Sequence, residues 1–273
     1  MSILKERRRV IGKMLKEQRW DRILELVDTK GVVKTTEVTE LLGVTPMTAR
    51  RDLQMLEELG RLERIHGGAK SLNMDRPLSY EELSHVEKKQ LRSEEKRSIA
   101  RKAAALIEEN ATVFIGPGTT NELIYEYIDV NARIFTNSFQ VFERFKNDAR
   151  FELMLIGGRY RERTGAFVGS FTNDIMSRIN VSLAFIGTNG VHNERITTAN
   201  EEEGACQKII LDNAQLKYIL CDSSKIGRVD LFDFYGLDHV DGLITDENIS
   251  EATLHHYSSY TEVIVGQNEQ QLV

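Results

Sequence analysis

The feature that most constrains the fold is a series of short apolar segments in residues 91–250, each ending in glycine or polar residues. Six such segments occur: TVFIGPG, RIFTN, ELMLIGG, LAFIGTNG, YILCDSS and GLITD. Helical patterns such as TNELIYEYI and EGACQKIILDN lie between them. Buried strands that alternate with helices are typical of a parallel α/β sheet. In such sheets ligands bind beyond the carboxyl ends of the strands, where these glycines and polar residues fall.

The most informative strand end is the loop GPGTT, residues 116–120. Glycines let backbone N–H groups approach an anion, and two hydroxyls with the N-terminus of the next helix would complete a phosphate-binding loop. A dinucleotide fingerprint would need a glycine where Asn121 stands, and the GK[ST] of a P-loop is absent. The loop therefore predicts phosphate binding without NAD or ATP, and no cofactor is expected.

A different pattern, of three short helices, fills most of residues 19–72. The first helix has apolar residues at helical spacing on one face: Trp20, Ile23, Leu24 and Val27. Gly31 ends it. The second runs from Thr36, as its N-cap, to Gly43. The third begins with Thr45 as N-cap and Pro46 at the first helical position, where its fixed φ suits the helix. Two short helices and a longer third one indicate a helix-turn-helix.

The third helix, TPMTARRDLQMLEELG, has an apolar face formed by Ala49, Leu53 and Leu56. Thr48, Arg51 and Gln54 then face outward, with Arg50 on the flank. Cations in the first turns of a helix oppose its macrodipole, so these arginines suit DNA contacts better than helix stability. The following segment RLERIHGGAKS predicts a hairpin wing. A plain helical hairpin with a solvated charged face is the alternative.

The run TPMTARRDLQMLEELGRLERIHGGA resembles the DNA-binding signature of DeoR-type regulators. The T-x-R-R-D-L core falls at Thr48–Leu53 and the wing motif R-x-H-G-G-A at Arg64–Ala69. The resemblance implies a winged helix-turn-helix that contacts an operator in double-stranded DNA. The contacts that it implies are Thr45, Thr48, Arg50, Arg51 and Gln54 of the helix and His66, Gly67 and Lys70 of the wing. Asp52 is expected to brace an arginine.

The second part of the chain resembles the DeoR sensor domain over most of residues 90–246, and through it the ribose-phosphate isomerase and glucosamine-phosphate deaminase fold. The matching positions are GPGTT, TNS at 136–138, IGGRYR at 156–161, GAFVG at 165–169, IGTNG at 186–190, TTANEEEG at 197–204 and DSSKIG at 222–227. The ligand-binding residues that this implies are Gly116, Gly118, Thr119, Thr120, Asn137, Arg161, Gly187, Glu203 and Lys225. The phosphate would bind at residues 118–120, and Asn137, Glu203 and Lys225 would meet hydroxyls or further phosphate oxygens.

Two departures from the family pattern bear on the ligand. Many relatives have D-S/G-G-T-T where this chain has GPGTT, a variant similar to that of lactose phosphotransferase system repressors, which respond to tagatose 6-phosphate. The resemblance therefore implies a ketohexose phosphate. The family's E-E-A-E stretch is E-E-G-A here, so the acid downstream of Glu203 is missing. The expected function is a homo-oligomeric repressor of a sugar-utilisation operon that a phosphorylated sugar releases from its operator. An activator of the same build remains open.

A sugar-phosphate isomerase or deaminase with an accessory DNA-binding domain is the alternative from another class. Isomerases of this fold carry an acidic loop and a lysine-glycine loop that are absent here. The deaminases carry Asp-Gly-His where this chain has NGVH, residues 189–192. Because asparagine cannot serve as a general base, no catalytic residue is expected. The histidines have no metal-ligand spacing, so no metal is expected either.

Charge also divides the chain. Residues 1–72 hold 15 Lys and Arg against 11 Asp and Glu, which leaves −10 for the remainder at a net charge of −6. This asymmetry is expected where one domain faces phosphates. Cys206 and Cys221 form no CxxC pair and are expected to be buried and reduced. Without an apolar stretch that could span a bilayer, we expect a cytoplasmic protein with no membrane partner.

The predicted division is an arm at residues 1–18, the winged helix-turn-helix at 19–72, a linker at 73–90, the sensor domain at 91–250 and a polar tail at 251–273. The arm either adds phosphate contacts or reflects a translation start that really lies at Met14. The linker follows from the loss of hydrophobic periodicity around Pro77. We expect the helix after it, residues 80–109, to transmit the signal between the domains.

Overall fold

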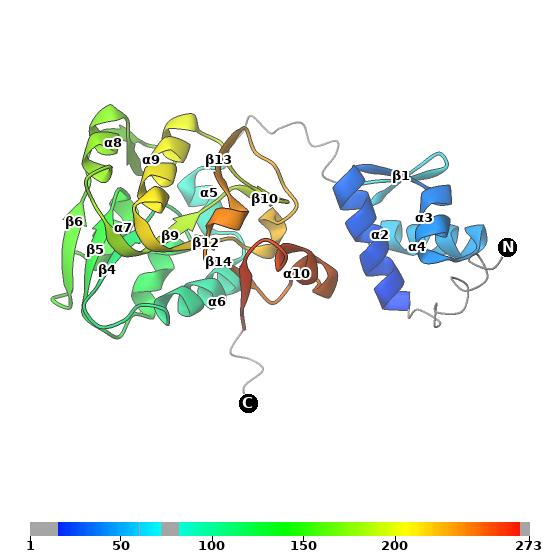
Figure 1. The fold of residues 1–273 in the computed structure, drawn as a ribbon, viewed down its shortest axis with the longest axis horizontal. Helices are drawn as coiled ribbons and strands as arrows, with labels where there is room; N and C mark the ends of the chain where they lie inside the picture. Colours follow the sequence, from blue (N-terminus) through cyan, green and yellow to red (C-terminus); the bar gives the residue numbers. More distant parts are fainter. Residues whose placement is uncertain (1–15, 60, 72–81, 268–273) are drawn as a thin grey trace. The chain divides into compact units, whose positions relative to one another are not determined.

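The computed structural model describes residues 16–59, 61–71 and 82–267. The chain forms two compact units that divide near residue 77. Figure 1 colours the first from blue to cyan and the second onward to red. The predicted arm up to residue 15, and the predicted linker up to residue 81, lie outside the described residues. None of the helices in the described ranges has the length and apolar character of a membrane span.

The N-terminal unit is a winged helix-turn-helix, as predicted. Within the residues described, it has three helices and an antiparallel sheet in the order β1-β3-β2. The elements are α2 (Lys16–Lys30), β1 (Val32–Lys34), α3 (Thr35–Leu42), α4 (Pro46–Glu58), β2 (Glu63–Ile65) and β3 (Gly68–Lys70). The helices share one apolar core, which includes Ile23, Val27, Val38, Ala49, Leu53 and Leu56.

Local signals in the sequence set the helix ends of this unit. Gly31 and Gly43 follow α2 and α3 with φ of 73° and 62°, the left-handed conformation that glycine adopts at no steric cost. The Thr45 hydroxyl caps α4 by accepting the N–H of Thr48 at 3.2 Å. The expected cap at Thr36 is wrong, because α3 begins at Thr35 and its N-cap is Lys34, whose N–H donates to the carboxylate of Glu37 at 2.8 Å.

The second unit is built on the predicted parallel sheet. Within residues 82–267, that sheet has seven strands in the order β15-β14-β12-β9-β4-β5-β6. Six of them contain the apolar segments of the sequence: β4 (Ala111–Ile115), β5 (Ala132–Thr136), β6 (Phe151–Leu155), β9 (Val181–Gly187), β12 (Ala214–Leu220) and β14 (Gly242–Asp246). The seventh, β15 (Glu262–Gly266), pairs with β14. The polar tail expected from residue 251 is therefore wrong, since Tyr257 at the end of α10 (Glu251–Tyr257) enters the core of this unit and β15 pairs with β14.

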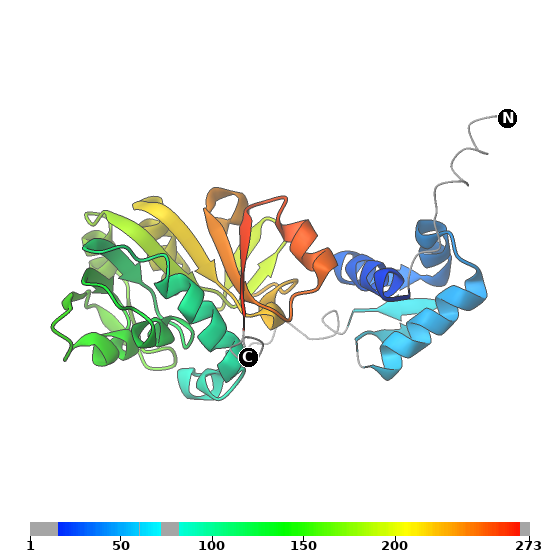
Figure 2. The same cartoon turned by 90° about the horizontal axis from the view of Figure 1, so that it is seen from below.

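Helices cover both faces of this sheet. One face packs against α6 (Ser93–Ala104), the 3-10 helix η1 (Asn121–Glu126) and α7 (Phe139–Phe145), and Figure 2 shows α6 lying along it. The other face packs against α8 (Ser170–Met176) and α9 (Glu201–Asp212). Cys206 and Cys221 are buried on this second side, as predicted.

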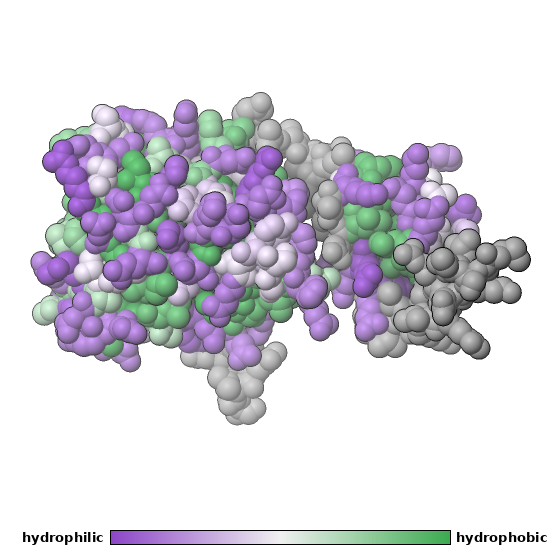
Figure 3. Space-filling view, viewed as in Figure 1, coloured by the Kyte–Doolittle hydropathy of each residue, from purple (hydrophilic) through white to green (hydrophobic). Residues whose placement is uncertain are grey.

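Shorter elements surround the carboxyl ends of the strands. They are the hairpin of β7 (Arg159–Arg161) with β8 (Ala166–Val168), the antiparallel strands β10 (Gly190–His192), β11 (Arg195–Thr198) and β13 (Phe232–Gly236), and the 3-10 turns η2 (Ser223–Lys225) and η3 (Leu237–His239). Figure 3 shows mainly hydrophilic residues on the face in view of each unit, with small apolar areas between them.

The single helix expected over residues 80–109 is two helices in the structure. The five-residue helix α5 (His85–Lys89) precedes α6, and Arg92 between them has a left-handed φ of 53°. A non-glycine residue in this conformation turns the chain sharply and ends helical hydrogen bonding. The chain changes direction at Arg92, so α5 does not continue along the axis of α6.

Candidate functional site

The predicted reading face of α4 is exposed in the structure. Thr45, Arg50, Arg51 and Gln54 are exposed and Thr48 is half-buried, while the opposite face enters the core. No carboxylate of the described residues forms an ion pair with Arg50 or Arg51. Two uncompensated cations beside exposed hydroxyl and amide groups can donate to phosphates and base edges.

A buried carboxylate fixes the back of this helix. Asp52 accepts hydrogen bonds from Arg19 at 2.8 Å and from the indole of Trp20 at 3.0 Å. This pairing, which joins α2 to α4, confirms that Asp52 braces an arginine. The hydrogen bonds with Asp52 raise the pKa of Arg19 against the opposing effect of its partial burial. Asp52 therefore positions the reading helix from behind.

The wing turns at His66 and Gly67, both exposed, between β2 and β3. Gly67 has a φ of 83°, and its carbonyl accepts the N–H of Thr35 at 2.8 Å. A Cβ on the following Gly68 would overlap the carbonyl of Val33 in β1, so this position requires glycine. Lys70, at the end of the wing, forms an ion pair with Glu63 at 3.1 Å.

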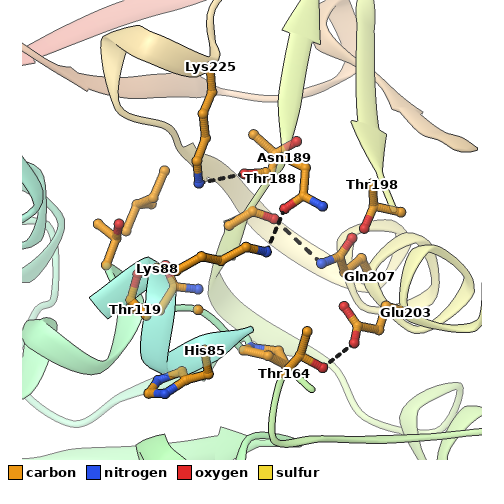
Figure 4. Close-up of a pocket in the computed structure, with 16 residues that line it drawn as sticks. His85, Lys88, Thr119, Thr164, Thr188, Asn189, Thr198, Glu203, Gln207 and Lys225 are labelled. Carbon is orange, nitrogen blue, oxygen red and sulfur yellow. Dashed lines mark hydrogen bonds between the residues drawn. The ribbon is translucent and has the colours of Figure 1, made fainter. Parts of the chain in front are cut away.

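A pocket of about 570 Å³ opens at the carboxyl ends of β4, β9 and β12 (Figure 4). Six of the nine predicted ligand residues line it: Gly118, Thr119, Thr120, Gly187, Glu203 and Lys225. Its lining also includes residues from the α5 segment and from the polar ends of the strands: His85, Lys88, Pro117, Asn121, Thr164, Thr188, Asn189, Thr198, Gln207 and Leu220.

The GPGTT loop is held by a buried asparagine. The amide of Asn121 donates to the carbonyls of Gly116 at 3.0 Å and Phe185 at 3.2 Å, which fixes the loop between β4 and β9. Gly118 has a φ of 147°, which an L side chain rarely adopts. Thr119 and Thr120 are nearly buried against the pocket, and a 3-10 helix follows instead of the expected α-helix. Backbone N–H groups and hydroxyls at such a turn can hold an anion.

Three predicted ligand residues do not line the pocket. Gly116 donates its N–H to the carbonyl of Phe185 and stands close against Ile186, so it serves strand packing. The Asn137 amide donates to the carbonyl of Phe167 at 2.8 Å and thereby fastens β8. Arg161 is engaged by the carboxylates of Glu82 and Glu203. Gly116 and Arg161 are thus committed to protein contacts, whereas the buried side-chain oxygen of Asn137 has no hydrogen-bond partner among the described residues.

Two lysines give one side of the pocket a positive charge. Lys225 donates to the carbonyl of Thr188 at 2.9 Å, and Lys88 donates to the side-chain oxygen of Asn189 at 3.1 Å. Burial lowers the pKa of Lys88, and the charge of Lys225 lowers it further. Both effects disfavour the ammonium form, so a bound anion would relieve them.

Oxygen acceptors occupy the other side. Burial raises the pKa of Glu203, whose carboxylate accepts from Arg161 at 3.0 Å and from the hydroxyl of Thr164. One turn along α9, the amide nitrogen of Gln207 donates to the carbonyl of Gly187 at 3.4 Å. Its buried oxygen has no hydrogen-bond partner in the described part of the chain. Such acceptors suit the hydroxyls of a polyol, while the lysines and the loop suit a phosphate.

Comparison with known proteins agrees with this division. Residues 19–75 match the DeoR-like helix-turn-helix domain, and residues 91–247 match the DeoR C-terminal sensor domain. The lactose phosphotransferase system repressor of Streptococcus mutans is 43% identical over 254 residues, which are 92% of this chain and 100% of that protein. The one of Lactococcus lactis is 40% identical over 257 residues, 92% of this chain and 99% of that protein. The chain belongs to the DeoR family.

Among solved structures, ribose 5-phosphate isomerase A from Methanocaldococcus jannaschii matches 48% of this DeoR-family chain and 53% of its own. The two are 17% identical with a TM-score of 0.36.

Several lining residues of this DeoR-family sensor domain were not predicted from the sequence. His85 and Lys88 fell in the segment assigned to the linker, although Ser84 and Glu87 have the S-x-x-E spacing of a capping box. The structure contains that box, with the N–H of Ser84 donating to Glu87 at 2.7 Å. Gln207 follows Glu203 by four residues on one helix, a spacing that places both on one face. These two local signals could have found three of the missing residues.

Proposed function

We propose that this DeoR-family chain is a transcriptional repressor of a sugar-utilisation operon, and a regulator without enzymatic activity, that a phosphorylated sugar releases from its operator. One observation carries the proposal. A pocket with a phosphate-type loop, cations on one side and hydroxyl acceptors on the other lies in the same chain as an exposed reading helix. The repressor names of relatives that align along nearly their whole length support the same role.

The DNA contacts are proposed on the exposed face of α4 and on the wing. Thr45, Thr48, Arg50, Arg51 and Gln54 would contact bases or phosphates from the helix, and His66, Gly67 and Lys70 would do so from the wing. Arginine can donate two hydrogen bonds to guanine in the major groove, whereas wing contacts to phosphates mainly set the register.

The effector is proposed to be a ketohexose phosphate such as tagatose 6-phosphate. Gly118, Thr119 and Thr120 would hold its phosphate together with Lys225, and Glu203 would accept from sugar hydroxyls. The lactose phosphotransferase system in the relatives' names supports a sugar of that metabolism.

The protein is proposed to act in the cytoplasm as a homo-oligomer, with two reading helices on two half-sites of the operator. An effector can release DNA only by binding the DNA-incompetent arrangement more tightly, with a coupling of about 1–3 kcal/mol.

Fluorescence anisotropy of labelled DNA from the gene's own upstream region tests this function. The full chain is titrated at fixed salt, and a panel of tagatose 6-phosphate, fructose 1-phosphate, fructose 6-phosphate, galactitol phosphate and the free sugars follows. We expect tight binding that one phosphorylated sugar reverses and no free sugar does. Binding that no compound changes would contradict the effector role, and no binding would contradict the repressor role.

A further inference from the structure

Helix α5 is attached to the sensor domain almost entirely by polar contacts. None of its residues is fully buried, although His85 and Lys88 are partly so, and its one apolar side chain, Val86, is 66% exposed. Leu83 and Leu91 on either side are also exposed. Because apolar burial is the main source of packing energy, α5 gains little of it. Its position therefore depends on hydrogen bonds and ion pairs.

The segment 82–85 is tied to the β7–β8 hairpin and to η1. The N–H of His85 donates to the carbonyl of Arg163 at 2.8 Å, and the guanidinium of Arg163 donates to the carbonyl of Glu82. The carboxylate of Glu82 also pairs with Arg161. On the other side, the His85 ring lies 3.2 Å from the carboxylate of Glu122. The Arg163 contact is exposed and therefore weak alone, whereas the Arg161–Glu82 and His85–Glu122 pairs are largely shielded from water and provide most of the attachment.

Lys88 connects this helix to the effector pocket. Its main-chain carbonyl accepts from the ammonium of Lys96, and its side chain extends across the pocket toward Asn189 (Figure 4). The ammonium shares the pocket lining with Thr119 and with the second cation, Lys225. Burial and the charge of Lys225 disfavour the Lys88 ammonium in this position, while the carboxylates of Glu82, 3.9 Å away, Glu203 and Asp230 favour it.

We propose that Lys88 is an anion-binding residue of the effector pocket, so that a bound phosphate fastens the segment 82–89 to the sensor domain. The ligand class is a phosphate monoester, gripped between the ammonium of Lys88 and the loop of residues 118–120. This inference rests on the effector site of the proposed function and adds to it a residue on the segment that follows the linker.

Through the position of α5, a small ligand can act on the rest of the chain. The α5 segment is the first described part of the sensor domain after residues 72–81. A phosphate that binds the docked α5 more tightly than the undocked one must shift the equilibrium toward docking. The effector favours docked α5 and, in the proposed function, disfavours DNA binding. By linkage, the DNA-bound arrangement must then be one in which α5 is more often undocked.

Isothermal titration of the full chain with tagatose 6-phosphate, and separately with inorganic phosphate, tests the role of Lys88. We expect Lys88→Met to bind each probe about tenfold or more weakly than wild type, as for a lost hydrogen bond to a charged group. Lys102→Met, which removes an exposed ammonium on α6 that has no ion pair within the described residues, is the control and should bind normally. Equal affinity of wild type and Lys88→Met would overturn this inference alone. No binding of either probe by wild type would overturn it together with the proposed effector site.

Hydrogen exchange provides a second readout, and its first measurement uses the wild type alone. In wild type, saturating tagatose 6-phosphate should slow exchange of the amides of residues 85–91 about tenfold or more. In Lys88→Met, at a concentration raised to saturate it, the loop amides of 118–122 should slow while those of 85–91 do not. Exchange of residues 85–91 that is unaffected by saturating ligand in wild type would overturn the fastening of α5.

Discussion

The reading face and the effector pocket differ in how far apart in the chain their residues lie. The predicted DNA contacts occupy one helix and one hairpin, all within residues 45–70. The pocket gathers side chains from His85 to Lys225. A helical period fixes which residues of α4 face outward, since Ala49, Leu53 and Leu56 must enter the core. No such period decides which of several polar residues at a sheet edge turn into a pocket.

The two sites also differ in how their cations are compensated. Arg50 and Arg51 have no ion pair with a described carboxylate, whereas each cation at the pocket already has protein partners. A DNA-binding surface of the protein can leave its arginines exposed to water, because hydration stabilises their charges. A pocket cannot, because a buried charge without partners costs several kcal/mol. The effector must therefore exchange contacts that exist, while DNA adds new ones.

The largest expected effect is on the stability of the N-terminal unit, and it tests whether the two units are independent. Asp52→Ala leaves Arg19 and the Trp20 indole without their shared partner, which should cost the N-terminal unit about 3 kcal/mol of unfolding free energy. Trp20 is the single tryptophan of the chain, so its fluorescence in urea reports this unit. Glu58→Ala, on the exposed side of the same helix, should change stability by at most about 0.5 kcal/mol. A loss of tagatose 6-phosphate affinity in Asp52→Ala would show that the units are not independent.

The next effect separates the two sites by function. Arg51→Ala should weaken operator binding about 10- to 100-fold, as for a lost arginine contact to a base, and leave effector affinity unchanged. Thr120→Val should do the reverse, with effector affinity about tenfold weaker because a hydrogen bond to a charged group is lost. Anisotropy and calorimetry on the same preparations measure both quantities. A variant that loses both functions would contradict the division.

Local features made the winged helix-turn-helix and six strands of the sheet predictable from the sequence. Gly31, Gly43 and the Thr45-Pro46 pair mark helix ends through conformations that depend on a few residues only. The seventh strand was missed, although EVIVG at residues 262–266 is also a short apolar run that ends in glycine; its place in the sheet is set by pairing with β14. A strand at a sheet edge is decided by such non-local contacts.

The same reason explains why Arg161 and Asn137, predicted as ligand residues, do not line the pocket. Arg161 and Asn137 have suitable chemistry, but Arg161 pairs with Glu82, 79 residues earlier, and Asn137 bonds Phe167 across the β8 strand. Neither partner is visible in a local window of sequence. Glu203 and Lys225, in contrast, follow an N-cap and a strand end that fix their direction locally.

A smaller effect tests whether the two sides of the pocket bind different parts of the effector. Gln207→Leu removes the buried oxygen that has no partner in the described residues, and should weaken tagatose 6-phosphate binding up to about tenfold through a lost hydroxyl contact. Inorganic phosphate, which has no sugar hydroxyls, should bind the variant as well as wild type. Competition calorimetry compares the two ligands. Equal losses for both would mean that Gln207 supports the pocket generally and does not distinguish its two sides.

The smallest effect is on the pH dependence of effector binding. Burial, with the charge of Lys225, lowers the pKa of Lys96 to about 8, and this ammonium holds the carbonyl of Lys88. It is charged below pH 8 and becomes neutral above it, whereas a sugar phosphate, with its second pKa near 6, keeps a constant charge from pH 7 to 9. The affinity for tagatose 6-phosphate should therefore fall about fivefold over this range, since about 1 kcal/mol of attraction is lost. Lys96→Met should flatten the profile at the weaker value. An affinity that stays constant or rises in wild type would mean that the cations of the DeoR sensor pocket, like those of the reading helix, act without depending on their protein partners.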